Sequence, residues 1–185
     1  MAEVHGSAVI DGVVLVDPVV HGDERGLFVE TWRREWLPDV PEMVQANRAD
    51  RAAGTVVGLH YHRHQADYWY VVVGRARVVL HDLRVGSPTL GATLELDLGG
   101  AGPERHRGVY IPPGVAHGFA AVTDVTLTYL VDGYHDPVDE LGVAWDDPAI
   151  GADWGVAQPV LSDRDMANPV CAGLDDDLRP RFGER

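Results

Sequence analysis

The chain has 185 residues, of which 45% are hydrophobic and 24% charged, and its 29 acidic and 15 basic residues give a formal net charge of −14. Such a chain can bury a hydrophobic core as one globular domain, which excludes collagen-like and disordered classes, and its acidic balance argues against nucleic acid as a partner. With one cysteine, no N-terminal signal sequence and no apolar run of about 18 residues, we expect a cytoplasmic protein that does not bind membranes.

Short apolar runs ending at Gly, Pro or Asp predict strands separated by tight turns. In chain order, the clearest runs cover residues 13–16, 70–73, 78–80, 94–98 and 125–131. Helical signals are confined to residues 31–37, which stop at Pro38, and to residues 162–167, where Ser162 is a suitable N-cap. The sequence therefore predicts an all-β barrel with a few short helices, as a single domain over residues 1–185, and leaves the packing of the tail after about residue 174 open.

Two histidine-bearing segments lie among these strands. Residues 60, 62 and 64 are histidines that share one face if their strand is regular, and a second segment leads from Pro112 to His117. The spacing of the first segment matches the first cupin motif, with Asp in the place of Glu, at Gly54, His60, His62, Asp67 and Gly74. The second cupin motif is matched by Pro112, Gly114 and His117. The chain thus resembles a cupin, a double-stranded β-helix or jelly-roll barrel that holds its site in the barrel mouth.

A second resemblance covers nearly the whole chain. Seven segments occur in the order found in the dTDP-4-dehydrorhamnose 3,5-epimerase family, at residues 22–30, 45–47, 58–61, 86–91, 116–119, 145–148 and 161–165. This resemblance implies a dimeric, metal-free jelly roll. It also implies an isomerase that removes protons from carbons beside the keto group of a dTDP-linked 4-keto-6-deoxyhexose and returns them to the other face.

The resemblance also assigns roles by position. It implies that His60, supported by Asp165, is the base and that Tyr129 is the acid on the opposite face. These roles are chemically coherent, because a neutral imidazole whose tautomer is fixed by a carboxylate can accept a proton near pH 7. Substrate-binding positions are implied, some of them serving the partner subunit's site, at Arg25, Phe28, Glu30, Gln45, Asn47, His117 and His135. Under this interpretation the reaction needs no cofactor.

Several positions depart from the family. Val57 stands where the family has a phosphate-binding Arg, and Asp67 stands where it has a Lys. His135 replaces a Tyr, Tyr70 replaces an Arg, and all 15 basic residues of the chain are Arg. We expect these changes to weaken binding of a diphosphate and of an enolate, because both need positive charge nearby.

The same changes restore the spacing of a metal site. Three imidazoles and one carboxylate, a donor set that suits Fe, Mn, Ni or Zn, are offered by His60, His62, Asp67 and His117. The alternative hypothesis is therefore a metal-dependent cupin enzyme, such as an oxygenase, lyase or cyclase, acting on a different small molecule. The two hypotheses compete for His60, which cannot ligate a metal and be a free base at once. A non-catalytic binding protein that retains the pocket is a third hypothesis.

Overall fold

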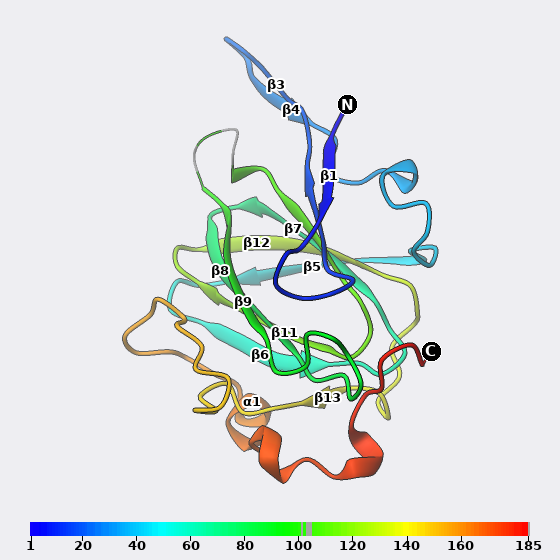
Figure 1. Cartoon of the computed structure of the whole chain (residues 1–185). Helices are drawn as coiled ribbons and strands as arrows, with labels where there is room; N and C mark the ends of the chain where they lie inside the picture. Colours follow the sequence, from blue (N-terminus) through cyan, green and yellow to red (C-terminus); the bar gives the residue numbers. More distant parts are fainter. Residues whose placement is uncertain (101, 103–104, 185) are drawn as a thin grey trace.

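The computed structural model describes residues 1–100, 102 and 105–184 and shows two antiparallel sheets packed face to face (Figure 1). The strands of the six-stranded sheet are, in spatial order, β1 (Glu3–Gly6), β2 (Val14–Asp17), β10 (Gly108–Ile111), β7 (Asp67–Val73), β12 (Val125–Val131) and β5 (Gln45–Arg51). Those of the five-stranded sheet are β13 (Leu141–Gly142), β6 (Val56–Tyr61), β11 (Val115–Ala121), β8 (Arg75–Asp82) and β9 (Thr93–Gly99). This architecture confirms the predicted all-β jelly roll.

A third, two-stranded sheet is the hairpin of β3 (Val20–Asp23) and β4 (Gly26–Val29), which extends away from the body of the barrel (Figure 1). The helical segments are short: η1 (Arg34–Trp36), α1 (Asp163–Ala167), η3 (Cys171–Gly173) and η4 (Asp176–Leu178). The helix expected over residues 31–37 is thus a single 3₁₀ turn, whereas α1 begins after Ser162 as predicted. Within the described ranges, no helix has the length and apolar character needed to cross a membrane.

Apolar side chains that alternate along the strands fill the space between the two large sheets. Val71 of β7, Leu127 of β12 and Phe119 of β11 belong to this cluster and are at most 3% exposed. Burying one such side chain stabilises the fold by roughly 1.5–3 kcal/mol.

The C-terminal segment covers the outer face of the five-stranded sheet (Figure 1). Leu174 is 8% exposed and packs in a cluster on that face. Further along, the Tyr61 hydroxyl donates to the Leu178 carbonyl at 3.2 Å, and the Val85 amide donates to the Pro180 carbonyl at 2.9 Å. The tail whose packing the sequence left open is therefore attached to the barrel through residue 180 and beyond.

One glycine allows β6 and β11 to approach closely enough to form the site. Gly58 has a φ of +105°, which favours glycine, and a Cβ built there would lie 2.7 Å from the His117 carbonyl oxygen and 2.8 Å from the Gly118 Cα. Because both neighbours are backbone atoms, they have little room to move. The absence of a side chain at Gly58 lets His60 stand opposite His117 in the ladder.

Candidate active site

A cavity of about 230 Å³ lies between the sheets and collects the polar side chains of both. The residues that line the cavity from β5, β7, β11 and β12 alternate along their strands, because every second residue of a strand points to the same face of its sheet. The groups with chemistry to offer come from five strands: Arg51 from β5, His60 from β6, Asp67 from β7, His117 from β11 and Tyr129 from β12. A larger hollow, of about 670 Å³, lies beside the N-terminal strand and holds none of the three predicted catalytic residues.

His60 and Asp165 form a hydrogen-bonded pair at this cavity. The His60 Nε2 atom lies 2.6 Å from the Asp165 Oδ1 atom, and the Ser162 hydroxyl donates to Asp165 Oδ2 at 2.9 Å. Asp165 sits in the first turn of α1, where Ser162 also caps its backbone amide. Burial alone would raise the pKa of Asp165, but the hydrogen bonds from His60 and Ser162 outweigh it and hold the pKa below its usual value. Because an ionised carboxylate only accepts, Nε2 carries the hydrogen and Nδ1 of His60 carries the free lone pair.

Tyr129 contributes a phenol to the same cavity. It lies in the middle of β12, with Asn47 of β5 and Trp69 of β7 as its neighbours in the ladder. Burial raises the pKa of Tyr129, and the negative charges of Asp67 and Glu140 raise it further. The phenol is therefore protonated at neutral pH and can serve as a proton donor.

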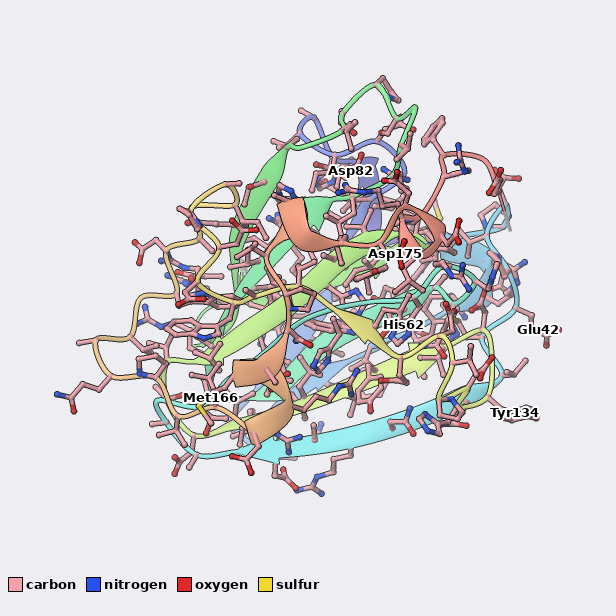
Figure 2. All side chains as sticks on the ribbon, turned by 90° about the horizontal axis from the view of Figure 1, so that it is seen from below. Glu42, His62, Asp82, Tyr134, Met166 and Asp175 are labelled. Atoms are coloured by element: carbon pink, nitrogen blue, oxygen red, sulfur yellow. The ribbon has the colours of Figure 1, made fainter. Side chains whose placement is uncertain are left out.

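Three of the four predicted metal ligands cluster, and the fourth does not join them. His62, Asp67 and His117 are all buried, and the ligand atoms that they offer lie within 4.8 Å of one another. Burial lowers the pKa of His117, which keeps this imidazole neutral. His60 departs from the predicted set of four, because the group of ligand atoms that lie within 4.8 Å of one another does not include it. In Figure 2 His62 lies near the middle of the face that the C-terminal segment crosses.

The substrate-binding residues predicted on the hairpin do not reach this cavity within one chain. Arg25 forms an ion pair with Asp23 in the β3–β4 turn, and the Phe28 side chain is 65% exposed. Glu30 follows β4 and pairs with Arg33 at 3.6 Å. These three residues line hollows beside the hairpin instead, among them the large one next to the N-terminal strand.

The remaining predicted binding residues lie at or near the cavity. Gln45 and Asn47 share a hydrogen bond of 2.9 Å and precede Ala49, a lining residue, on the same face of β5. His117 lines the cavity directly. His135 lies in an exposed loop, where its Nδ1 atom is 3.6 Å from Glu140, which lines the cavity.

Two arginines of the site were missed by sequence reasoning. Arg51 and Arg164 both line the cavity, and Arg164 contacts Glu140 at 3.1 Å. Arg51 could have been found, because it lies four residues after Asn47 on β5 and so shares its face. Arg164 could not, because its position depends on how α1 packs against β6. The cavity thus keeps two guanidinium groups although the chain lacks the cations of the family at Val57 and Asp67.

Comparisons with known proteins agree with this geometry. The sequence profile of the dTDP-4-dehydrorhamnose 3,5-epimerase family matches residues 7–172. The chain is 33% identical over 165 residues to the dTDP-4-dehydrorhamnose 3,5-epimerase of Shigella flexneri, covering 85% of this chain and 90% of that protein. It is 36% identical over 165 residues to a dTDP-4-dehydrorhamnose 3-epimerase of Streptomyces niveus, covering 85% and 78%.

A solved structure matches nearly the whole chain. It is that of the dTDP-6-deoxy-D-glucose-3,5-epimerase of Legionella pneumophila in complex with dTDP-4-keto-L-rhamnose. The two structures superpose with a TM-score of 0.89 at 30% sequence identity, covering 98% of this chain and 99% of the Legionella chain.

Proposed function

The chain belongs to the dTDP-4-dehydrorhamnose 3,5-epimerase family, and from this premise we propose that it epimerises a dTDP-linked 4-keto-6-deoxyhexose through His60, Asp165 and Tyr129. The family match supports an isomerase rather than a metal-dependent oxygenase, lyase or cyclase. The assignment of catalytic roles to these three residues rests on the 2.6 Å bond between His60 and Asp165 at a cavity that Tyr129 also lines.

The proposed reaction begins with removal of a proton by His60. Hydrogen bonding to Asp165 leaves the lone pair on Nδ1, so this nitrogen takes the proton from a carbon next to the ketone. The C–H electron pair moves into the ring and forms an enolate, with the negative charge on the keto oxygen. Asp165 stabilises the resulting imidazolium, because its ionised carboxylate accepts the Nε2 hydrogen bond.

Tyr129 completes the inversion. Its phenol donates a proton to the opposite face of the enolate carbon, which restores the ketone with the configuration of that carbon reversed. The reaction leaves His60 protonated and Tyr129 ionised, and exchange with water resets both groups. Because each event is a proton transfer between the sugar and the chain, the proposed chemistry needs no redox cofactor.

The negative charges of substrate and intermediate need compensation. Arg51 and Arg164 are the cations that line the cavity among the described residues, and we propose that they face the diphosphate and the enolate. Arg51 also lies close enough to Tyr129 to oppose the rise in its pKa. A guanidinium is suited to this task because it can donate two parallel hydrogen bonds to one phosphate.

The proposed function is tested by solvent exchange. The protein is incubated in D₂O with dTDP-4-keto-6-deoxyglucose, and the sugar is examined by mass spectrometry and proton NMR. We expect deuterium at carbon 3, carbon 5 or both, at a rate proportional to protein concentration. If a large excess of protein adds no deuterium beyond the rate in buffer alone, the proposed function is wrong.

We further propose that the active form is a homodimer. The β3–β4 hairpin projects from the barrel, and its Leu27 and Phe28 side chains are 58% and 65% exposed (Figure 1). Apolar side chains on a projecting hairpin favour burial against a second copy, which would bring Arg25 and Phe28 near a partner's cavity. Sedimentation equilibrium should give twice the monomer mass, and Phe28→Asp should shift it to the monomer. The cytoplasmic location stays a prediction.

A further inference from the structure

We infer that His62, Asp67 and His117 bind a divalent transition-metal ion beside the His60–Asp165 pair. The three residues come from the loop after β6, the start of β7 and β11, and all three are buried. Two imidazoles and one carboxylate that line one cavity make a three-ligand set that leaves positions open for substrate.

The hydrogen bonds of the two histidines leave the correct nitrogens free. His62 Nδ1 lies 3.0 Å from the Asp139 carbonyl oxygen, and His117 Nδ1 lies 2.9 Å from the Val115 carbonyl oxygen. A carbonyl only accepts, so each Nδ1 carries a hydrogen, which leaves Nε2 as the nitrogen of each ring that can bind a metal. Metal-binding histidines are usually oriented in this way, by donating their second ring nitrogen to a carbonyl or carboxylate.

The carboxylate of Asp67 is buried and is hydrogen-bonded only by neutral donors among the described residues. It is 3% exposed, and its two oxygens accept hydrogen bonds from Gln65 Nε2 at 3.1 Å and from Trp69 Nε1 at 2.9 Å. Both donors are neutral, and among the described residues no arginine forms an ion pair with this carboxylate. Each carboxylate oxygen can accept more than the one hydrogen bond it receives, so the group has acceptor capacity left for a metal ion.

The spacing fits one ion. The three ligand atoms lie within 4.8 Å of one another, and around a metal with bonds of about 2.0–2.1 Å neighbouring ligand atoms are roughly 3 Å apart. Binding of one ion would require the three side chains to rotate until their ligand atoms reach this separation. His60 stays with Asp165, so the metal site and the proposed base occupy the cavity together.

The position of the ion suggests its use. It would place a positive charge where the family resemblance implies a Lys, at the residue that is Asp67 here. A divalent ion polarises a carbonyl oxygen and stabilises the enolate formed from it. This catalytic use rests on the proposed function, whereas the binding of the ion does not.

The inference is tested by measuring metal rather than turnover. Protein without an affinity tag is stripped with EDTA, dialysed against Co²⁺ or Zn²⁺, and analysed by elemental mass spectrometry. We expect one ion per chain. Asp67→Asn and His117→Gln, which conserve size, should each lower the affinity more than about 100-fold, whereas the exposed His64→Asn should bind like the wild type. His60→Asn should also keep its ion, because His60 is not a ligand.

A spectrum of the unmodified protein supplies a second measure that does not depend on the folding of variants. With Co²⁺ bound, the Nδ1 hydrogens of His62 and His117 should appear as two strongly shifted proton resonances that vanish in D₂O. Less than about a tenth of an ion per chain, or equal binding by wild type and both ligand variants, would overturn the site. Loss of the ion from His60→Asn would overturn the three-residue assignment. Metal binding without solvent exchange would refute the proposed function and leave the site standing.

Discussion

Replacing His60 with asparagine is expected to lower the rate of deuterium incorporation at least about 10³-fold, the upper part of the range for a general base. Asparagine can still hydrogen-bond near Asp165, but its amide cannot accept a proton at neutral pH. Since both proposed C–H cleavages begin at this imidazole, exchange should fail at carbon 3 and carbon 5 alike. The measurement is the initial rate of deuterium uptake, followed by NMR.

The matched control is His64→Asn, which changes an exposed histidine four residues further along the chain. This variant should keep the rate of the wild type. The exchange rate of Asp165→Asn should lie between those of His60→Asn and His64→Asn. This variant keeps the imidazole but removes the carboxylate that fixes its tautomer and stabilises its charge. If His60→Asn retains a tenth or more of the wild-type rate, another group is the base.

Tyr129→Phe is expected to separate proton removal from inversion. His60 can still remove a proton and return deuterium to the same face, so exchange with retention of configuration should persist. Formation of the epimer should fall roughly 10²-fold or more, because the opposite face has lost its proton donor. NMR of the product gives both quantities at once, and the ratio of exchange to inversion should rise by the same factor.

Tyr70→Phe is the control for this variant. Tyr70 lies on β7, the strand next to β12, but it points to the outer face of the sheet, where its hydroxyl lies 2.8 Å from His106. Its replacement should alter neither exchange nor inversion. Epimer formation by Tyr129→Phe at the wild-type rate would show that water or another side chain protonates the second face.

Much of the fold could be predicted from local sequence. The apolar run at residues 125–131 coincides with β12, and Ser162 caps α1 as its position indicated. The run from 70 to 73 is only the end of β7, which begins at Asp67, because charged and polar residues are tolerated in a strand that faces a cavity. The helix expected at 31–37 is reduced to one 3₁₀ turn, whose Trp36 packs together with Trp32 against the outer apolar cluster of the six-stranded sheet.

The site was predictable to the extent that strand alternation decides it. His60, His117 and Tyr129 line one cavity, as a shared barrel face requires. The contact between His60 and Asp165 spans 105 residues and was expected only from the family resemblance. Motif spacing alone does not reveal that His60 pairs with a carboxylate on α1 instead of joining His62 at a metal site. This pairing depends on tertiary packing.

The charge of the site was harder to predict. Comparison with the family indicated a loss of cations at Val57 and Asp67 and hence weaker binding of an enolate and a diphosphate. The cavity contains two arginines that this comparison did not consider, Arg51 and Arg164. Arg51 of β5 and Arg164 of α1 are therefore cations of the cavity, with Arg164 paired to Glu140 at 3.1 Å, and the three-residue cluster around Asp67 offers a place for a further positive charge.

The central claim is that a sugar ring lies in the cavity with His60 on one face and Tyr129 on the other. A crystal structure with an unreactive dTDP-linked 6-deoxyhexose that lacks the keto group measures this directly. The proposed mechanism predicts a ring carbon about 3–3.5 Å from His60 Nδ1 and the Tyr129 hydroxyl across the ring from it. A sugar bound outside the cavity, or one with both side chains on the same face of its ring, would contradict the mechanism.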